Sequence, residues 1–451
     1  MKKILILGAG RSSGHLIEYL ITQAHKYHWK LRVGDYSIDL AHEKIKDANN
    51  AKAFHFDAQN EGQCIREISD CDLVISMLPA NMHISIAQFC IELGKNMVTA
   101  SYVSDAFKSL DAPAKEKGLT ILKECGLDPG IDHMSAMFVM DQIRKKGGDL
   151  TSFETFTGGL LAPTTDDNPW QYKFTWNPRN VVLAGNGTVK FIQEGRFKYI
   201  PYHRLFKRTE VIHIPEYGYF EGYANRDSLK YLEIYGLEGI RTLYRGTLRR
   251  PGFCKTWNIF VQLGATDDSY EMEGVHKMTH RQFINSFLSY NPYDSVELKL
   301  AHYMNLDRDA QEMYMLKWLG MFENEPIGLK KGTPAQILEH ILKKKWTLNP
   351  DDRDMIVMWH KFEYTMNGEN YVTTSHMVAE GENATNTAMA KTVGLPLGIA
   401  AKNILLGKID APGLIVPNVP EVYLPVLKEL KKYGIRFYEE GKKITNAGSM
   451  V

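Results

Sequence analysis

Short apolar runs alternate with amphipathic segments over the first 125 positions. An apolar run of about four to eight residues predicts a buried strand, and apolar residues that recur every three to four positions predict a helix. The predicted strands are Ile4–Leu7, Lys30–Val33, Ala53–Phe56, Leu73–Leu78, Asn96–Thr99 and Leu119–Leu122. Strands and helices that alternate in this way indicate an α/β fold, with a doubly wound parallel sheet of the Rossmann type over residues 1–125.

The pattern changes beyond residue 125. Residues 126–277 and 355–383 are rich in Gly, Pro, Trp and Tyr and hold extended segments such as Thr256–Leu263, so we expect a second domain of the α+β class. Residues 278–354 show a helical period and predict a small helical insertion. In the C-terminal segment, 384–451, a helix is predicted over Thr385–Leu406, kinked or broken at Gly394-x-Pro396.

Composition narrows the functional class. Lys and Arg number 54 and Asp and Glu 53, so the chain lacks the basic surplus of proteins that bind nucleic acid or anionic lipid. No apolar run approaches the ~20 residues that span a bilayer. The five cysteines form no C-x-x-C pair, which disfavours a disulfide framework and a thiolate metal site. We therefore expect a soluble cytoplasmic protein with a small-molecule partner, and no nucleic-acid partner, membrane partner or metal.

A glycine-rich turn follows the first predicted strand. Gly8 permits the tight turn, and Gly10 lacks the Cβ that would keep a pyrophosphate from the positive end of the next helix. Because the turn joins a strand to a helix inside an alternating α/β segment, it predicts a dinucleotide site. The residues predicted to bind the dinucleotide here are Gly8, Ala9, Gly10, Arg11, Ser12 and Ser13.

The end of the second predicted strand bears on the choice of dinucleotide. Asp35 lies about 20 residues beyond the glycines, where a carboxylate bonds the ribose 2′-hydroxyl and repels a 2′-phosphate. Tyr36 beside it adds no positive charge. NAD is therefore favoured over NADP, with capping of the next helix as the alternative role of Asp35. Asp57, Leu78 and Pro79, which also follow strands, complete this part of the predicted cofactor site.

Five further motifs occur in order along the chain. They are Gly126-Leu127-Asp128-Pro129-Gly130-Ile131-Asp132-His133, Gly158-Gly159-Leu160-Leu161-Ala162-Pro163, Asp167-Asn168-Pro169 with Tyr172-Lys173-Phe174-Thr175-Trp176, Asn225-Arg226-Asp227-Ser228 and Arg245-Gly246-Thr247-Leu248-Arg249. Together they resemble the saccharopine reductases, the glutamate-forming saccharopine dehydrogenases. The resemblance is strong over residues 1–265 and looser beyond. It implies a three-domain enzyme whose C-terminal segment returns to the Rossmann domain, and it suggests a homodimer formed through the second domain.

The resemblance also implies a reaction and a set of site residues. Saccharopine would be oxidised to glutamate and α-aminoadipate semialdehyde through an imine, with NAD or NADP as acceptor, in lysine metabolism. The residues implied for substrate binding are Ser101, Tyr102, Asp128, Arg226, Thr247, Leu248 and Arg249. Gly126, Leu127 and Trp176 would line the nicotinamide, and Asp128, Tyr102 and Lys173 are the expected catalytic residues. Guanidinium groups suit a substrate with three carboxylates.

Two positions depart from the family pattern. Family members have a cysteine before the Gly-Gly pair, and this chain has Thr157 there. A hydroxyl has a much higher pKa than a thiol and does not replace it closely in proton transfer. Familiar members also favour NADP and carry an arginine after the second strand, where this chain has Asp35 and Tyr36.

Two other functions stay open. A carboxynorspermidine-type dehydrogenase would carry out the same chemistry on a polyamine and would need carboxylates, which Asp166, Asp167 and Asp227 could supply. A non-catalytic nucleotide sensor would bind dinucleotide without turnover. His276 and His280 have the spacing of a helical metal pair, and residues 10–14 have the spacing of a hydrolase elbow. Both motifs lack the other residues that such sites need.

Overall fold

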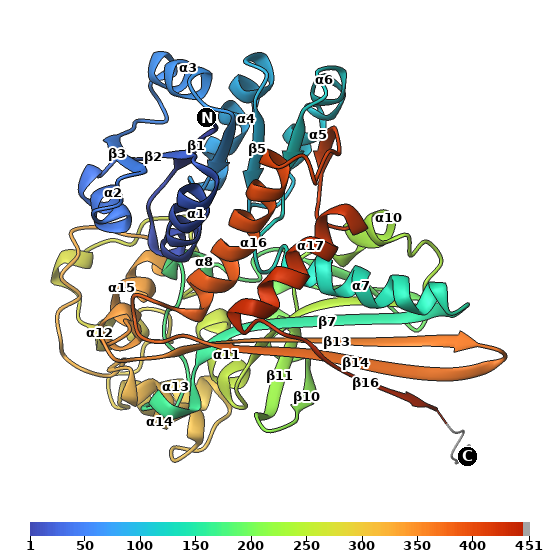
Figure 1. Ribbon diagram of the computed structural model, residues 1–451. Helices are drawn as coiled ribbons and strands as arrows, with labels where there is room; N and C mark the ends of the chain where they lie inside the picture. Colours follow the sequence, from blue (N-terminus) through green and yellow to red (C-terminus); the bar gives the residue numbers. More distant parts are fainter. Residues whose placement is uncertain (445–451) are drawn as a thin grey trace. The chain divides into compact units, whose positions relative to one another are not determined.

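The structure is a computed structural model of the chain and describes residues 1–444 (Figure 1). The chain forms two compact units, one of residues 1–150 with the segment from 364 onward, and one of residues 151–363. The C-terminal segment predicted over 384–451 thus lies in the first unit, and its last seven positions, 445–451, lie outside the described residues. The finer domain boundaries derived from the sequence stay a prediction.

A seven-stranded parallel sheet forms the centre of the first unit, in the order β15-β6-β5-β4-β1-β2-β3. Its strands are β1 (Lys3–Leu7), β2 (Lys30–Asp35), β3 (Ala51–His55), β4 (Leu73–Ser76), β5 (Asn96–Thr99), β6 (Thr120–Leu122) and β15 (Gly413–Ile415). The predicted α/β fold and its doubly wound sheet are confirmed. The strand order reverses between β1 and β4, which is where such sheets bind ligands at the carboxyl ends of their strands.

Helices of the first unit follow the strands, and two more come from the end of the chain. They are α1 (Gly14–Tyr27), α2 (Ile38–Ile45), α3 (Glu61–Ser69), α4 (His83–Glu92), α5 (Asp105–Lys108), α6 (Asp111–Glu116), α7 (Ile131–Lys145), α16 (Ala388–Leu405) and α17 (Pro420–Leu430). The unit also holds β14 (Glu369–Glu380), which pairs antiparallel with β16 (Tyr438–Lys443).

Helix α16 packs closely against α1, as Figure 1 shows for the orange and dark blue helices. A Cβ on Gly394 would lie 2.8 Å from the Leu16 nitrogen, and one on Gly398 would lie 2.7 Å from the Tyr19 ring, so glycine is required at both crossings. Of the two predicted forms the break is wrong, because α16 runs through Pro396 as one helix, and the kink stays a prediction. Burial of nearly the whole helix stabilises it and outweighs the lost backbone hydrogen bond.

The second unit contains a mixed sheet and most of the remaining helices. Its strands are β7 (Asp149–Leu161), β8 (Val189–Gln193), β9 (Arg196–Ile200), β10 (Thr209–Ile214), β11 (Gly218–Ala224), β12 (Thr242–Arg249) and β13 (Asp354–Met366). Its helices are α8 (Pro178–Val182), α9 (Tyr202–Leu205), α10 (Tyr231–Tyr235), α11 (Phe253–Leu263), α12 (His280–Asn285), α13 (Val296–Met304), α14 (Gln311–Trp318) and α15 (Pro334–Trp346). Strand β12 pairs parallel with β7 and antiparallel with β11.

One predicted element of the second unit is wrong. The segment Thr256–Leu263 was expected to be extended, and it forms most of helix α11. Its aromatic and β-branched residues favour a strand locally, but Trp257 and Phe260 are buried in an aromatic cluster at helical spacing. Tertiary packing therefore decides the structure of this segment.

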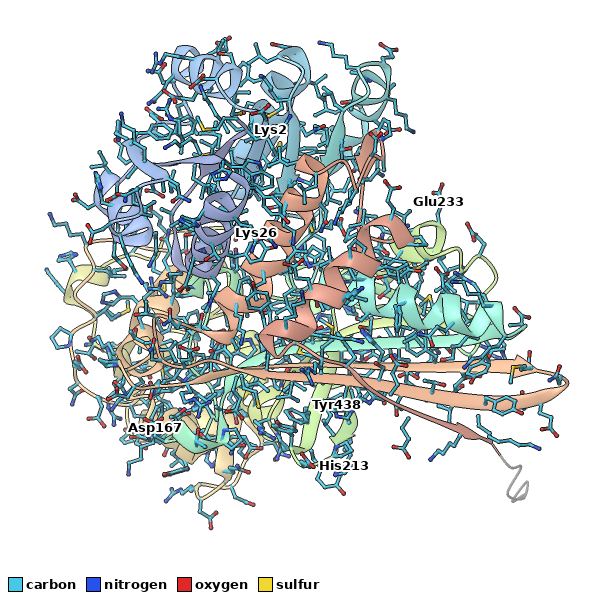
Figure 2. The ribbon with its side chains drawn as sticks, in the orientation of Figure 1. Lys2, Lys26, Asp167, His213, Glu233 and Tyr438 are labelled. Carbon is cyan, nitrogen blue, oxygen red and sulfur yellow. The ribbon has the colours of Figure 1, made fainter. Side chains whose placement is uncertain are left out.

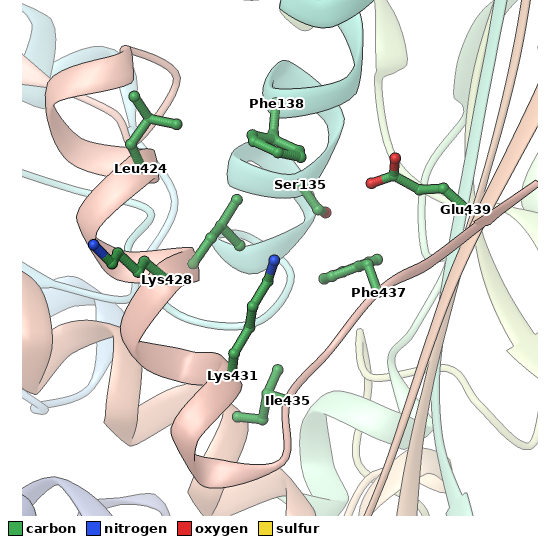
Figure 3. A pocket seen from close by; sticks show the side chains of 9 residues that line it. Ser135, Phe138, Leu424, Lys428, Lys431, Ile435, Phe437 and Glu439 are labelled. Atoms are coloured by element: carbon green, nitrogen blue, oxygen red, sulfur yellow. The ribbon is translucent and has the colours of Figure 1, made fainter.

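A cavity of about 240 Å³ opens between α7, α17 and the segment that leads into β16 (Figure 3). Its lining residues are Ser135, Phe138, Leu424, Leu427, Lys428, Lys431, Ile435, Phe437 and Glu439. None of them belongs to the predicted cofactor or substrate site. Among residues 1–444, no helix is both long enough and apolar enough to cross a membrane.

Candidate active site

The glycine turn lies at the carboxyl end of β1. Gly8 has a φ of +103°, and a Cβ there would lie 2.8 Å from the carbonyl oxygen of Met77, so no other residue fits. A Cβ on Gly10 would meet no atom within 4 Å, which leaves open space beside the turn. The Ser13 hydroxyl donates to the Gly10 carbonyl at 2.8 Å and fixes the turn before α1 begins. This open cradle fits the pyrophosphate of a dinucleotide.

Asp35 braces the glycine turn from the end of β2. One carboxylate oxygen accepts a hydrogen bond from the Ala9 N–H at 2.7 Å, and the other accepts one from the Ser37 N–H at 2.8 Å. The carboxylate therefore links the backbone of the turn to that of the following loop. Asp35 thus has a structural role that does not depend on the ribose of a cofactor.

The other predicted cofactor residues lie at strand ends of the same sheet. Tyr36 is 75% exposed. Asp57 follows β3 and accepts a hydrogen bond from the Gln59 N–H at 2.9 Å. Leu78 packs against the apolar core, and Pro79 precedes the short helical turn at 80–82. The structure thus places these residues on the ligand-binding edge of the sheet, and their contacts with a cofactor stay a prediction.

Tyr102 and Asp128 come together although they lie on different strand ends. The Tyr102 hydroxyl donates to the Asp128 carboxylate at 3.0 Å. Asp128 belongs to a tight turn in which a Cβ on Gly130 would lie 2.1 Å from the Gly126 carbonyl oxygen. Because the backbone of this turn has so little freedom, the Asp128 carboxylate is held at the end of β6, beside Tyr102 at the end of β5.

The Ser101 hydroxyl bonds to a residue that the sequence analysis missed. His83, at the start of α4, lies 2.6 Å through Nε2 from the Ser101 hydroxyl and 2.8 Å through Nδ1 from the Ser76 hydroxyl. Burial lowers the pKa of His83 to about 4, and the charge of Lys123 acts in the same direction. No motif in the sequence pointed to this histidine, because its two partners come from the ends of β4 and β5.

Arg249 is a buried charged group of the second unit. It is the last residue of β12 and only 4% exposed. Its guanidinium carbon lies 5.0 Å from the centre of the Tyr172 ring and 5.2 Å from that of Phe253. One nitrogen donates to the Leu248 carbonyl at 2.8 Å, whereas Nε has no partner and no carboxylate pairs with the group within residues 1–444. A buried cation in this state fits an anionic ligand group.

Two threonines lie on the same face of the mixed sheet as Arg249. Thr247 is two residues before Arg249 on β12, and Thr157 on β7 is its register partner, so all three side chains point the same way. The Thr157 hydroxyl is buried without a hydrogen-bond partner in the described part of the chain. Leu248 points to the opposite face and is fully buried, so it can offer only its backbone to a ligand.

Lys173 is buried as well, but it has acidic partners. Its ammonium lies 2.7 Å from the Asp352 carboxylate and 2.9 Å from that of Asp167, which Figure 2 labels. Burial alone would lower the pKa of Lys173, but the hydrogen bonds to these two carboxylates outweigh it and raise the pKa. An ammonium held in this way favours a structural role over the predicted proton transfer.

The remaining predicted residues of the second unit are more exposed. Arg226 lies in the loop after β11 with a φ of +54°, and its carbonyl accepts a hydrogen bond from the Lys190 N–H at 3.0 Å. Trp176 is half-buried just before α8. His280 Nδ1 donates to the Gly320 carbonyl at 3.1 Å. Within residues 1–444, no group of three His, Cys, Asp or Glu side chains is arranged to hold a metal.

Comparison with known proteins identifies the family. A family model described as the saccharopine dehydrogenase NADP binding domain matches residues 4–122, and one described as the saccharopine dehydrogenase C-terminal domain matches residues 126–435. The chain belongs to the saccharopine dehydrogenase family. The family resemblance drawn from the sequence motifs is thereby confirmed, and so is a nicotinamide cofactor for the first unit. A preference of this family member for NAD is not supported.

Relatives resemble this saccharopine dehydrogenase family member along nearly its whole length. It is 34% identical to the mitochondrial alpha-aminoadipic semialdehyde synthase of Mus musculus over 443 residues. The aligned region covers 97% of this chain and 47% of that protein. The chain thus spans about half the length of the synthases that it matches. It is 32% identical to the saccharopine dehydrogenase [NADP(+), L-glutamate-forming] of Schizosaccharomyces pombe, with coverage of 98% and 99%.

A solved structure supports the same assignment. Apo histidine-tagged saccharopine dehydrogenase (L-Glu forming) from Saccharomyces cerevisiae is similar with a TM-score of 0.88 at 30% identity, over 98% of this chain and 100% of that one. A similarity of this extent covers both units and includes all five motifs of the sequence analysis.

Proposed function

We propose that this chain oxidises saccharopine with a nicotinamide cofactor to an imine, which water then hydrolyses to glutamate and α-aminoadipate semialdehyde, as a step of lysine metabolism. The single observation that carries the proposal is Arg249, a buried guanidinium without a carboxylate partner in residues 1–444, in a chain of this family. Saccharopine has three carboxylates, and an arginine fork binds a carboxylate through two hydrogen bonds. The names of the fungal relatives support the same substrate.

The first unit binds the cofactor in this proposal and holds the reacting amine. Residues 8–13 receive the pyrophosphate, Leu78 and Pro79 lie toward the adjoining ribose, and Gly126 and Leu127 lie toward the nicotinamide. When bound, the nicotinamide ring supplies the hydride acceptor. Asp128 stabilises the positive charge of the amine and of the imine that follows, and Tyr102 orients the Asp128 carboxylate through its hydrogen bond.

The second unit supplies most of the groups for the substrate carboxylates. Arg249, Thr247 and Arg226 take anionic groups of the substrate in this proposal. Thr157 stands where relatives have a cysteine, and it acts here as a hydrogen-bonding group rather than as an acid. Proton transfer therefore falls to Asp128, Tyr102 and water.

We propose NADP as the preferred cofactor. The description of the domain over residues 4–122 and the names of the fungal relatives support this choice. The sequence argument for NAD depended on Asp35, whose two carboxylate oxygens already accept hydrogen bonds from Ala9 and Ser37. Arg11, which is exposed in the glycine turn, supplies a cation for the 2′-phosphate in this proposal, because Arg32 on β2 is already paired with Glu67 at 2.6 Å.

The polyamine alternative requires carboxylates that are free to bind a cationic substrate, and its three candidate carboxylates already have partners within the protein. Asp167 is paired with Lys173 at 2.9 Å, Asp227 lies 3.5 Å from the Lys190 ammonium, and Asp166 accepts a hydrogen bond from Gln171 at 2.5 Å. Partners within the protein thus satisfy these carboxylates. The nucleotide-sensor alternative leaves the buried charge of Arg249 without an explanation.

A direct spectrophotometric assay tests the proposal. Purified protein is mixed with saccharopine and either NADP or NAD, and absorbance of the reduced nicotinamide is followed, with carboxynorspermidine as the control substrate. Turnover of saccharopine with NADP preferred supports the proposal. Turnover of carboxynorspermidine alone, or cofactor binding without turnover of either substrate, contradicts it.

We also propose a cytoplasmic homodimer. The dimer rests on the family resemblance, and the compartment rests on five buried free cysteines without a disulfide in residues 1–444. Sedimentation of the purified chain and localisation of a tagged copy test the two parts separately.

A further inference from the structure

We infer that His83 is a positioning residue that aims the hydroxyl proton of Ser101 toward a carboxylate of the substrate. The inference rests on the proposed function, because it assigns Ser101 to the same amino-acid substrate. It adds a residue that neither the sequence motifs nor the family descriptions point to.

Three side chains form the arrangement, two from the ends of neighbouring strands and one from the start of helix α4. The Ser76 hydroxyl lies 2.8 Å from His83 Nδ1, and His83 Nε2 lies 2.6 Å from the Ser101 hydroxyl. Ser76 is the last residue of β4. Ser101 lies just beyond Thr99, the last residue of β5, and β5 is the parallel neighbour of β4. Ser76 and His83 are buried, whereas Ser101 is half-buried, so the chain of hydrogen bonds leads from the interior to the ligand edge of the sheet.

The direction of the protons follows from counting donors and acceptors. Within residues 1–444, the only hydrogen-bond partner of the Ser76 hydroxyl is His83 Nδ1. If Nδ1 carried the imidazole proton, the fully buried Ser76 proton would have no acceptor, which is costly. Ser76 therefore donates to Nδ1, and the imidazole proton is on Nε2. Nε2 then donates to the Ser101 oxygen, and the Ser101 proton is left for an acceptor outside the triad.

A neutral imidazole is required for this arrangement. His83 is enclosed by the protein, and the ionisable side chain whose charge acts on it is Lys123, a cation at the end of β6. A second positive charge is disfavoured there, so His83 remains a one-donor, one-acceptor group at neutral pH. A carboxylate is the acceptor that a hydroxyl with a fixed outward proton binds best, because the hydrogen bond is charge-assisted.

Kinetics of matched variants test the inference. Ser101→Ala and His83→Ala are each expected to raise the KM for saccharopine about tenfold to hundredfold, with kcat and the cofactor KM within about twofold. His83→Ala should have no further effect in the Ser101→Ala background, because both substitutions remove one interaction. If the increases in the KM for saccharopine caused by the two single substitutions multiply in the double variant, the inference is overturned.

Two isosteric variants keep the test valid if His83→Ala fails to fold. A glutamine amide nitrogen reaches the place of Nε2, whereas the asparagine amide reaches only that of Nδ1. His83→Gln should therefore retain a KM within about threefold of the parent, and His83→Asn should show the full increase. Equal effects of the two variants would contradict the inference. His280→Asn, which removes a buried histidine bonded to Gly320, is the matched control and should leave the KM unchanged.

The tautomer can be measured without any substrate. In ¹⁵N-histidine-labelled protein, assigned by loss of the signal in His83→Gln, long-range ¹H–¹⁵N correlations should show a neutral ring protonated on Nε2 from pH 6 to 8. A ring protonated on Nδ1, or a charged ring, overturns the inference whatever the substrate is. Absence of saccharopine turnover by the parent protein instead contradicts the proposed function, so the two failures are distinguishable.

Discussion

Lys173 and Arg249 are both buried cations of the second unit, and they differ in what surrounds them. Lys173 is 2% exposed and lies within 3 Å of two carboxylates. Arg249 is 4% exposed and lies among aromatic rings, with no carboxylate beside it in the described chain. Carboxylates of the protein pair with the first charge, whereas the proposed function supplies an anion for the second charge from the substrate. Burial of a charge therefore indicates a binding site only when the folded chain leaves that charge unpaired.

The largest effect is expected at Lys173, and it should be on stability. Lys173→Met leaves the buried Asp352 carboxylate without its ion pair, which typically costs about 3–5 kcal/mol of the free energy of unfolding. Urea unfolding followed by tryptophan fluorescence measures the change. If Lys173→Met keeps the stability of the parent protein but has a lower kcat, the structural role of Lys173 is contradicted. That result would support its predicted catalytic role instead.

Arg249 should show the opposite behaviour. Arg249→Met is expected to lower kcat/KM for saccharopine about 100-fold, because a buried hydrogen-bonded partner of a substrate carboxylate is lost. The free energy of unfolding should stay the same or rise by about 1 kcal/mol, because an unpaired buried cation is removed. Steady-state kinetics and urea unfolding of one preparation give both values, and a loss of stability without a loss of activity would reverse the assignment.

Lys123 of the first unit is a third buried cation, and it allows the cost of burying a charge to be measured by changing the pH. Burial lowers its pKa to about 8 from an ordinary value of 10.5, and its ammonium lies 3.5 Å from the centre of the Phe107 ring. Between pH 8 and 10.5 the unfolded chain binds this proton and the folded chain does not. The contribution of Lys123 to stability therefore rises with pH across this window, by about 3 kcal/mol. Below pH 8 both states are protonated, and its contribution is constant.

The variant Lys123→Met isolates this contribution. Urea unfolding at pH 7 and at pH 9.5 is compared for the parent and the variant, and the difference between them should shrink at the higher pH. A difference that does not change with pH would show that Lys123 keeps an ordinary pKa in the folded protein.

The smallest effect is expected at Thr157, whose buried hydroxyl has no partner in residues 1–444. Thr157→Val keeps the shape and removes the unsatisfied group, so the free energy of unfolding should rise by up to about 1 kcal/mol. A modest rise in the KM for saccharopine, about twofold to fivefold, is expected if the hydroxyl binds substrate. Thr157→Ser is the control, and it should keep the parent KM.

The nucleotide-binding part of the fold could be predicted because its signals are local. An apolar strand, the Gly8 and Gly10 turn and a following helix occupy adjacent positions, and the structure confirms each of the six predicted strands of the sheet. The seventh strand, β15, was missed because its three residues carry no periodicity that distinguishes a strand from a loop.

The site residues that were missed or reinterpreted depend on distant partners. Lys173 lies in a recognisable motif, but its partner Asp352 is 179 positions away, so its ion pair could not be foreseen. The hydrogen bonds of His83 link the ends of neighbouring strands, and no sequence pattern relates the three residues. Tyr102 and Asp128 were expected to serve the same site through the family resemblance, and their hydrogen bond is a finding of the structure.

The edge strand β15 has a consequence for the order in which the protein is made. The first six strands of the nucleotide-binding sheet are complete by residue 122, but the strand that covers β6 is contributed by residues 413–415, after the entire second unit. A chain emerging from the ribosome must therefore carry an uncovered sheet edge, and an α1 without its α16 neighbour, while residues 151–363 are synthesised. The β6 edge therefore stays unpaired while the second unit is synthesised, and an unpaired strand edge of this kind can pair with other chains.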